Sequence, residues 1–157
     1  MLIDDADAAL LESPCSLIVG TVDETGLPDA TRAWGVEVLA DREHVRVVLD
    51  ADAKASLANV ASTHAFALTA TDVSTFTSVQ IKGRVVSVEP ESDADRARRK
   101  NFIDGFARAV NATDGTPVEL LLRMKPCAFV TVVATIEDAF DQTPGPTAGR
   151  RRAPAAS

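Results

Sequence analysis

Hydrophobic and polar residues alternate along much of this chain, which is the pattern of β-strands with one buried face. Between residues 28 and 39, for example, Trp34 and Val36 fall on one face of the predicted strand and Glu37 falls on the other. Turn-forming residues separate such segments, as in the Asp-Glu-Thr-Gly string at residues 23–26. On this basis strands are predicted over residues 15–22, 28–39, 45–49, 64–70, 75–88 and 127–136.

Three other segments have the wider spacing of amphipathic helices. Asp4 is placed to cap the first of them, and Ser92 and Asp95 have the spacing of a capping box at the start of the last. The last segment is the clearest helix, because its apolar residues recur on one face over many turns. Helices are therefore predicted over residues 4–12, 53–61 and 92–111.

The order of these elements favours a mainly β (α+β) fold, a six-stranded antiparallel split β-barrel with a few flanking helices. Closing the sheet also removes the exposed edges that so many short strands otherwise leave. A length of 157 residues is typical of one domain. We expect that domain over residues 1–140, and a flexible tail over residues 141–157, where Pro, Gly, Ala and Arg dominate.

Charge and hydropathy argue against two classes of partner. The formal net charge is −7, whereas a nucleic-acid-binding protein needs a basic face. The basic cluster from Arg96 to Lys100 is expected to be the solvated face of a helix. No run of about eighteen apolar residues occurs, so no membrane span is expected. The acidic start of the chain also lacks the basic and apolar parts of a secretion signal.

Cysteine and histidine usage favours a cytoplasmic protein without a metal. Cys15 and Cys127 lie far apart, and each opens an apolar run after a proline, so two buried free thiols in a reducing compartment are expected. His44 and His64 share no metal-ligand spacing with either cysteine, so no metal site is predicted.

Two cationic residues provide the candidate chemistry. Arg32 lies in the predicted second strand, and Lys54 lies at the start of the helix that follows the third. Taken singly, each is most simply an exposed surface charge. Taken together, they predict an anion site, because arginine forms directional charge-assisted bonds to phosphate and the start of a helix presents free N–H groups.

This arrangement resembles the pyridoxamine 5'-phosphate oxidase-like, FMN-binding split-barrel family. The matching features are Arg32, the hairpin at residues 41–44, the strand at residues 45–49, Lys54, and the string Ser-Val-Gln-Ile-Lys-Gly at residues 78–83. The resemblance is detailed over the first five predicted strands and looser over the closing helix and strand.

The resemblance implies an FMN-dependent oxidoreductase that acts on a small molecule as a homodimer, with the flavin at the subunit interface. In this family an arginine and a lysine at such positions lie near the flavin phosphate, and the flavin ring lies along the third strand. The implied cofactor-binding residues are Arg32, Val47, Val48, Leu49, Lys54, Ser78 and Gln80. The resemblance assigns no catalytic residue and no particular substrate.

Departures from the family pattern keep two alternatives open. Asp52 and Ala53 precede the lysine where the family has serine and a basic residue, and the chain has no tyrosine. One alternative is a deazaflavin coenzyme, whose longer acidic tail needs further basic residues such as Arg42 or Lys82. The other is a non-catalytic flavin- or haem-binding or storage protein, with His44 and His64 as the two histidines available to ligate haem.

Overall fold

The computed structural model describes residues 2–153 of the chain. The helices and strands, in chain order, are α1 (Asp5–Glu12), β1 (Ser16–Val22), β2 (Pro28–Val38), β3 (His44–Asp50), α2 (Lys54–Thr63), β4 (Ala65–Thr71), β5 (Ser78–Pro90), α3 (Asp93–Asp114), α4 (Val118–Arg123), β6 (Phe129–Thr135) and β7 (Asp138–Asp141). Within the described part of the chain, no helix is both long enough and apolar enough to cross a membrane.

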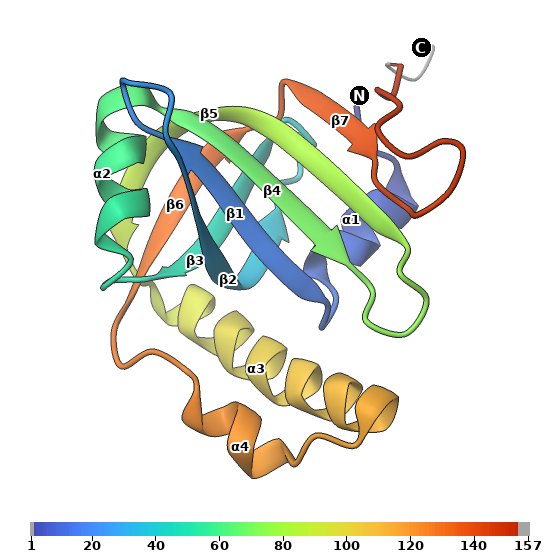
Figure 1. Cartoon of the computed structure of the whole chain (residues 1–157). Helices are drawn as coiled ribbons and strands as arrows, with labels where there is room; N and C mark the ends of the chain where they lie inside the picture. The colour runs from blue at the N-terminus through green and yellow to red at the C-terminus, as the bar shows by residue number, and fades with distance from the viewer. Residues whose placement is uncertain (1, 154–157) are drawn as a thin grey trace.

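Six of the strands close into an antiparallel barrel, which confirms the predicted fold class (Figure 1). The strand order is β4-β1-β2-β3-β6-β5, and pairing of β5 with β4 closes the ring. The long strand β5 pairs with β4 through its first half and with β6 through its second half. The short strand β7 then pairs with the first half of β5 on the side away from β4.

Gly83 lies where β5 passes from one partner strand to the other. A Cβ atom at this position would lie 2.0 Å from the backbone oxygen of Thr135. Only glycine therefore lets β6 approach β5 so closely, and the glycine noted in the sequence marks the bend through which a single strand serves both halves of the barrel.

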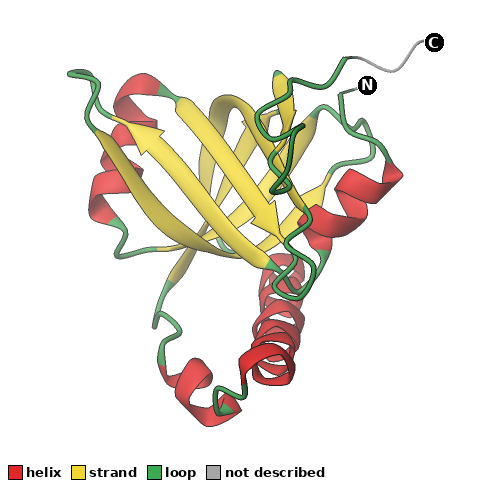
Figure 2. Cartoon of the chain, turned by 45° about the vertical axis from the view of Figure 1, so that its right-hand side comes forward, coloured by secondary structure: helices red, strands yellow, loops and turns green. Residues whose placement is uncertain are grey.

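The core fills the inside of the barrel with alternate residues of each strand. On β3, for example, Val45, Val47 and Leu49 are fully buried. Helices α1 and α2 lie at opposite sides of the barrel and add Leu11 and Val60 to this core (Figures 1 and 2). Helices α3 and α4 lie together beneath the barrel, with α3 packed against β2.

The six predicted strands and three predicted helices are all present, and two short elements were not predicted. Helix α4 spans six residues, none of them buried, and β7 spans four residues. Segments this short contain too few periods for a hydrophobic pattern to identify them.

The segment after β7 contacts the barrel. The backbone N–H of Arg152 donates to the carbonyl oxygen of Ala139 at 2.8 Å, and its Nη1 donates to the Asp7 carboxylate of α1 at 2.7 Å. The flexibility expected of residues 141–157 stays a prediction, and residues 154–157 lie outside the described part of the chain.

Candidate cofactor site

Arg32 lies on the outer face of β2, beside an apolar cavity beneath the barrel. The neighbouring residue Ala33 is fully buried and points into the barrel, so the alternation of the strand turns Arg32 and Trp34 outward. The cavity has a volume of about 320 Å³ and lies between β2, α3 and α4. Its lining consists of Arg32, Trp34, Ile103, Phe106, Ala107, Val110, Leu121 and Met124.

The guanidinium group of Arg32 is incompletely satisfied by the protein. Its Cζ lies 5.3 Å from the centroid of the Phe106 ring, a cation–π contact. Its Nη1 is buried and has no hydrogen-bond partner among the described residues. A buried donor without an acceptor costs about 1–3 kcal/mol. Such a group at the wall of a cavity is suited to receive an acceptor atom from a ligand.

Lys54 is exposed at the first position of α2, and it forms no ion pair with any residue between 2 and 153. No side chain caps the N-terminus of this helix. Ala33 of β2 pairs with Leu49 of β3, and Lys54 follows β3 after a short turn. The fold therefore places both predicted phosphate contacts at the same end of the β2–β3 pair, although no direct contact joins them.

The three predicted ring-lining residues of β3 belong to the interior. Val47, Val48 and Leu49 are each at most 1% exposed, and β3 lies between β2 and β6, which pair with it on either side. Their side chains help to shape the barrel wall behind Arg32. Any contact between these residues and a cofactor stays a prediction.

Ser78 and Gln80 share the outer face of β5, as their spacing implied. Ser78 is buried, and its hydroxyl lies 2.9 Å from the Thr71 hydroxyl and 2.8 Å from the Phe76 carbonyl oxygen. Gln80 donates to the Thr69 hydroxyl at 2.9 Å. The Ser78 hydroxyl is therefore already used by the protein, whereas the Gln80 side chain is half-buried and keeps part of its surface accessible.

Strand register brings Arg32 and Gln80 into one row on the outside of the sheet. Arg32 pairs with Ile18, Ile18 with Thr69, and Thr69 with Gln80. This row crosses three strand spacings, roughly 14 Å in all. Figure 1 shows that no helix covers β1 and β4 on the side toward the viewer. The row connects the Arg32 cavity to this uncovered part of the sheet.

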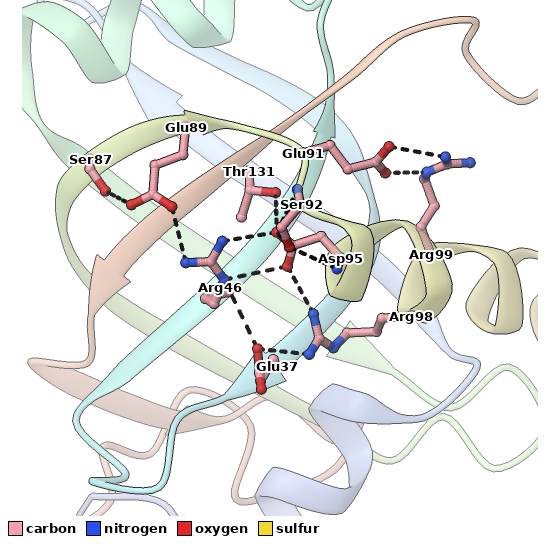
Figure 3. Close-up of polar contacts among 10 residues, drawn as sticks. All are labelled: Glu37, Arg46, Ser87, Glu89, Glu91, Ser92, Asp95, Arg98, Arg99 and Thr131. Atoms are coloured by element: carbon pink, nitrogen blue, oxygen red, sulfur yellow. Dashed lines mark hydrogen bonds and ion pairs between the residues drawn. The ribbon is translucent and has the colours of Figure 1, made fainter.

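A second polar cluster was not predicted, and it centres on Asp95 in the first turn of α3 (Figure 3). The side chain of Asp95 is 1% exposed. It accepts hydrogen bonds from Arg46 Nη2 at 2.9 Å, Arg98 Nη1 at 2.9 Å and the Ser92 hydroxyl at 2.7 Å. Burial by itself raises the pKa of Asp95, but these bonds outweigh it and hold the pKa well below its ordinary value.

Part of the basic cluster in α3 is paired rather than solvated, which corrects the sequence-based expectation. Arg98 Nη2 lies 2.7 Å from the Glu37 carboxylate, and Arg99 Nε lies 2.5 Å from the Glu91 carboxylate. The Arg99 guanidinium also lies 4.0 Å from the centroid of the Phe129 ring. These partners lie outside the local helical pattern, so helical periodicity did not reveal them. Arg96 and Lys100 are exposed, as expected.

The Asp95 cluster is internally satisfied and therefore structural. Arg46 is shared between Asp95 and Glu89, and the Thr131 hydroxyl donates to Asp95 at 3.1 Å. The cluster joins the start of α3 to β2, β3, β5 and β6, as Figure 3 shows. It fixes the helix that forms one wall of the Arg32 cavity.

The histidines and cysteines add no second site. The ring of His44 pairs with Asp41, with 2.8 Å between Nδ1 and Oδ2, and His64 Nδ1 lies 3.2 Å from the Val85 carbonyl oxygen. In the part of the chain that the structure describes, no three His, Cys, Asp or Glu side chains are grouped to bind a metal ion. Both cysteines are free. Cys15 is buried, as predicted, but Cys127 is exposed because it precedes β6 rather than lying within it.

Comparison with known proteins identifies the fold. No family model matches the sequence, and no curated protein matches it. A proposed pyridoxamine 5'-phosphate oxidase from Lactobacillus delbrueckii is 20% identical, with a TM-score of 0.55 over 88% of this chain and 93% of the other. An FMN-binding protein from Syntrophomonas wolfei is 13% identical, with a TM-score of 0.55 over 85% of this chain and 81% of the other. An F420 reductase is 15% identical, with a TM-score of 0.53 over 87% of this chain and 98% of the other.

The chain therefore has the split-barrel fold of the pyridoxamine 5'-phosphate oxidase-like proteins, and the resemblance found in the sequence is confirmed at the level of the fold.

Proposed function

We propose that this chain is an FMN-dependent oxidoreductase that acts on a small molecule as a homodimer. The observation that carries the proposal is the unpartnered, buried Nη1 of Arg32 in the wall of an apolar cavity on this fold. Lys54 supports it as a second cation without an ion-pair partner among residues 2–153. A phosphate group is the acceptor that such a pair best matches in charge.

The size of the cavity bears on the assembly. Pockets that enclose small ligands measure about 300–1,000 Å³. At about 320 Å³, the Arg32 cavity lies at the lower end of this range, so a ligand as large as FMN would extend beyond it. The remainder would lie along the outer row toward Gln80, where a second subunit would cover it. A cofactor enclosed in this way would lie at the interface of a homodimer.

A bound flavin would supply the electron transfer, and the residues of this chain would position it. Arg32 and Lys54 would bind the phosphate, and Gln80 would donate to or accept from the polar edge of the ring. The backbone of Val47, Val48 and Leu49 would support the ring from behind. The two free thiols suit a reducing compartment such as the cytoplasm.

A second candidate function is non-catalytic binding on the same scaffold. One observation favours it: Arg32 is the one ionisable residue in the cavity lining, so no acid or base stands ready for proton transfer. Haem is less favoured than flavin, because neither His44 nor His64 lines the Arg32 cavity. A deazaflavin coenzyme would recruit Lys82 more readily than Arg42, which is paired with Asp5.

The test is direct titration of the purified protein with FMN, followed by gel filtration and a visible spectrum. We expect retained flavin, and Lys54→Ala should weaken FMN binding about tenfold because a charge-assisted hydrogen bond is lost. Lys100→Ala, which replaces another exposed lysine, on α3, is the matched control and should bind as the wild type does. A wild-type protein that retains no FMN overturns the proposal.

Reduction of the bound flavin separates the two candidate functions. Anaerobic addition of NADH, NADPH or dithionite is followed at the flavin absorption band. Reduction by a nicotinamide and reoxidation by an added acceptor favour the oxidoreductase. Reduction by dithionite alone favours the binding protein.

A further inference from the structure

We infer that the cavity between β2, α3 and α4 is a binding site for an apolar carboxylate, such as a medium-chain fatty acid. This goes beyond the proposed function, since it assigns a second class of ligand to the cavity of the flavin-free protein, where the carboxylate would take the place of a flavin phosphate at Arg32. The inference rests on the contrast between the apolar residues that line the cavity and the one charged residue among them, Arg32.

The residues that line the cavity favour a ligand with an apolar chain. Seven of the eight lining residues are hydrophobic or aromatic, with Trp34 and Phe106 as the largest. The volume of about 320 Å³ corresponds to roughly ten water-sized groups at about 30 Å³ each. A chain of about eight to ten carbons therefore fills the space, and each buried methylene adds about fourfold to its affinity.

The one charge favours an anionic head. Nη1 of Arg32 is buried and unpartnered within the described residues, and no acidic side chain lines the cavity. A carboxylate oxygen at this position would accept the missing hydrogen bond and neutralise the charge. A neutral alcohol of the same length would fill the same space but would leave the charge unbalanced. Charge complementarity thus selects a fatty acid over other apolar molecules.

Helix α4 forms the outer wall and gives such a ligand a way in. It has six residues, none buried, and Met124 directly after it is 68% exposed although it lines the cavity. Gly115, with φ +80°, and a short linker separate it from α3. An outer wall of this kind can open without disturbing the barrel.

Trp34 makes the test simple, because it is the one tryptophan of the chain and it lines the cavity. Flavin-free protein is titrated with hexanoate, octanoate and decanoate while Trp34 fluorescence is recorded. We expect saturable binding that tightens about fifteenfold for each two methylenes. Decanol should bind about ten- to a hundredfold more weakly than decanoate, because the charge-assisted bond is absent.

Two variants connect the binding to this cavity. Arg32→Met should abolish the preference for decanoate over decanol while keeping the dependence on chain length. Val110→Phe, which fills the cavity from α3, should weaken both ligands. Equal affinities for decanoate and decanol in the wild type, or no dependence on chain length, overturn the inference. Because the titration contains no flavin, its outcome is read separately from the test of FMN binding.

Discussion

Replacing Asp95 by asparagine removes the charge at the centre of the cluster that attaches α3 to the barrel. The substitution keeps the size of the side chain but leaves Arg46 and Arg98 facing a neutral amide at sites where each is now 2.9 Å from a carboxylate oxygen. Both guanidinium groups keep a second partner, Glu89 for Arg46 and Glu37 for Arg98.

The expected cost follows from burial. Removing one partner of a buried ion pair destabilises a protein by about 3–5 kcal/mol. Asp95 is 1% exposed, but Arg46 and Arg98 are 22% and 25% exposed and remain partly paired, so the lower end of that range applies. A loss of about 3 kcal/mol lowers the melting temperature of a domain of this size by about 6–12 °C.

Asp93→Asn is the matched control in the same turn of the helix. The Asp93 side chain is 99% exposed and pairs only with Arg96, which is 58% exposed, so its replacement should change stability by less than about 0.5 kcal/mol. Urea denaturation and thermal melts of the three proteins measure the difference. If Asp95→Asn and Asp93→Asn melt within a degree of each other, the cluster does not hold α3 in place.

Three further predictions test other parts of the structure. Arg32→Met should stabilise the protein by about 1 kcal/mol in thermal melts, because the unpaired donor costs about 1–3 kcal/mol and the cation–π contact returns only about 0.5–1 kcal/mol; a clear loss of stability would show that Arg32 is satisfied. The free energy of unfolding should fall between pH 5 and pH 3. The pKa of Asp95 is lowered in the folded protein, so Asp95 contributes stability above its unfolded-state pKa of about 3.9, and this stability is lost as the pH decreases. Asp95→Asn should flatten the dependence of stability on pH in this range. Gly83→Ala should prevent accumulation of soluble protein, because its Cβ would lie 2.0 Å from a backbone oxygen, whereas Gly20→Ala, with 3.9 Å to the nearest atom, should be tolerated.

The barrel was predictable because its strands have clear hydrophobic alternation and glycine or acidic turns between them. Helix α4 and strand β7 are too short for a hydrophobic pattern to reveal them. Helix α4 is held by contacts with α3, and β7 is held by pairing with β5, which is distant in the sequence. The exposure of Cys127 also could not be predicted from the hydrophobic pattern. This residue opens an apolar run, yet the strand begins only at Phe129, so the thiol is exposed.

The candidate site likewise has features that the sequence predicts and features that it does not. The period of two places Ser78 and Gln80 on one face of β5 and turns Arg32 to the side of β2 opposite Ala33. Sequence alone does not reveal that strand register joins Arg32 and Gln80 in one row, since β1 and β4 lie between their strands. Nor does it reveal that Arg98 finds Glu37 on β2, which lies far away in the sequence.

The Asp95 cluster and the Arg32 cavity depend on each other through α3. The cluster fixes the first turn of this helix against the sheet, and later turns supply Phe106, Ala107 and Val110 to the cavity wall. Without that helix, the outward face of β2 would be open to water and Arg32 would be an ordinary solvated charge. A structural ion cluster therefore leaves the Nη1 atom of Arg32 buried and unpartnered, and the ligand binding proposed for Arg32 depends on this change of environment.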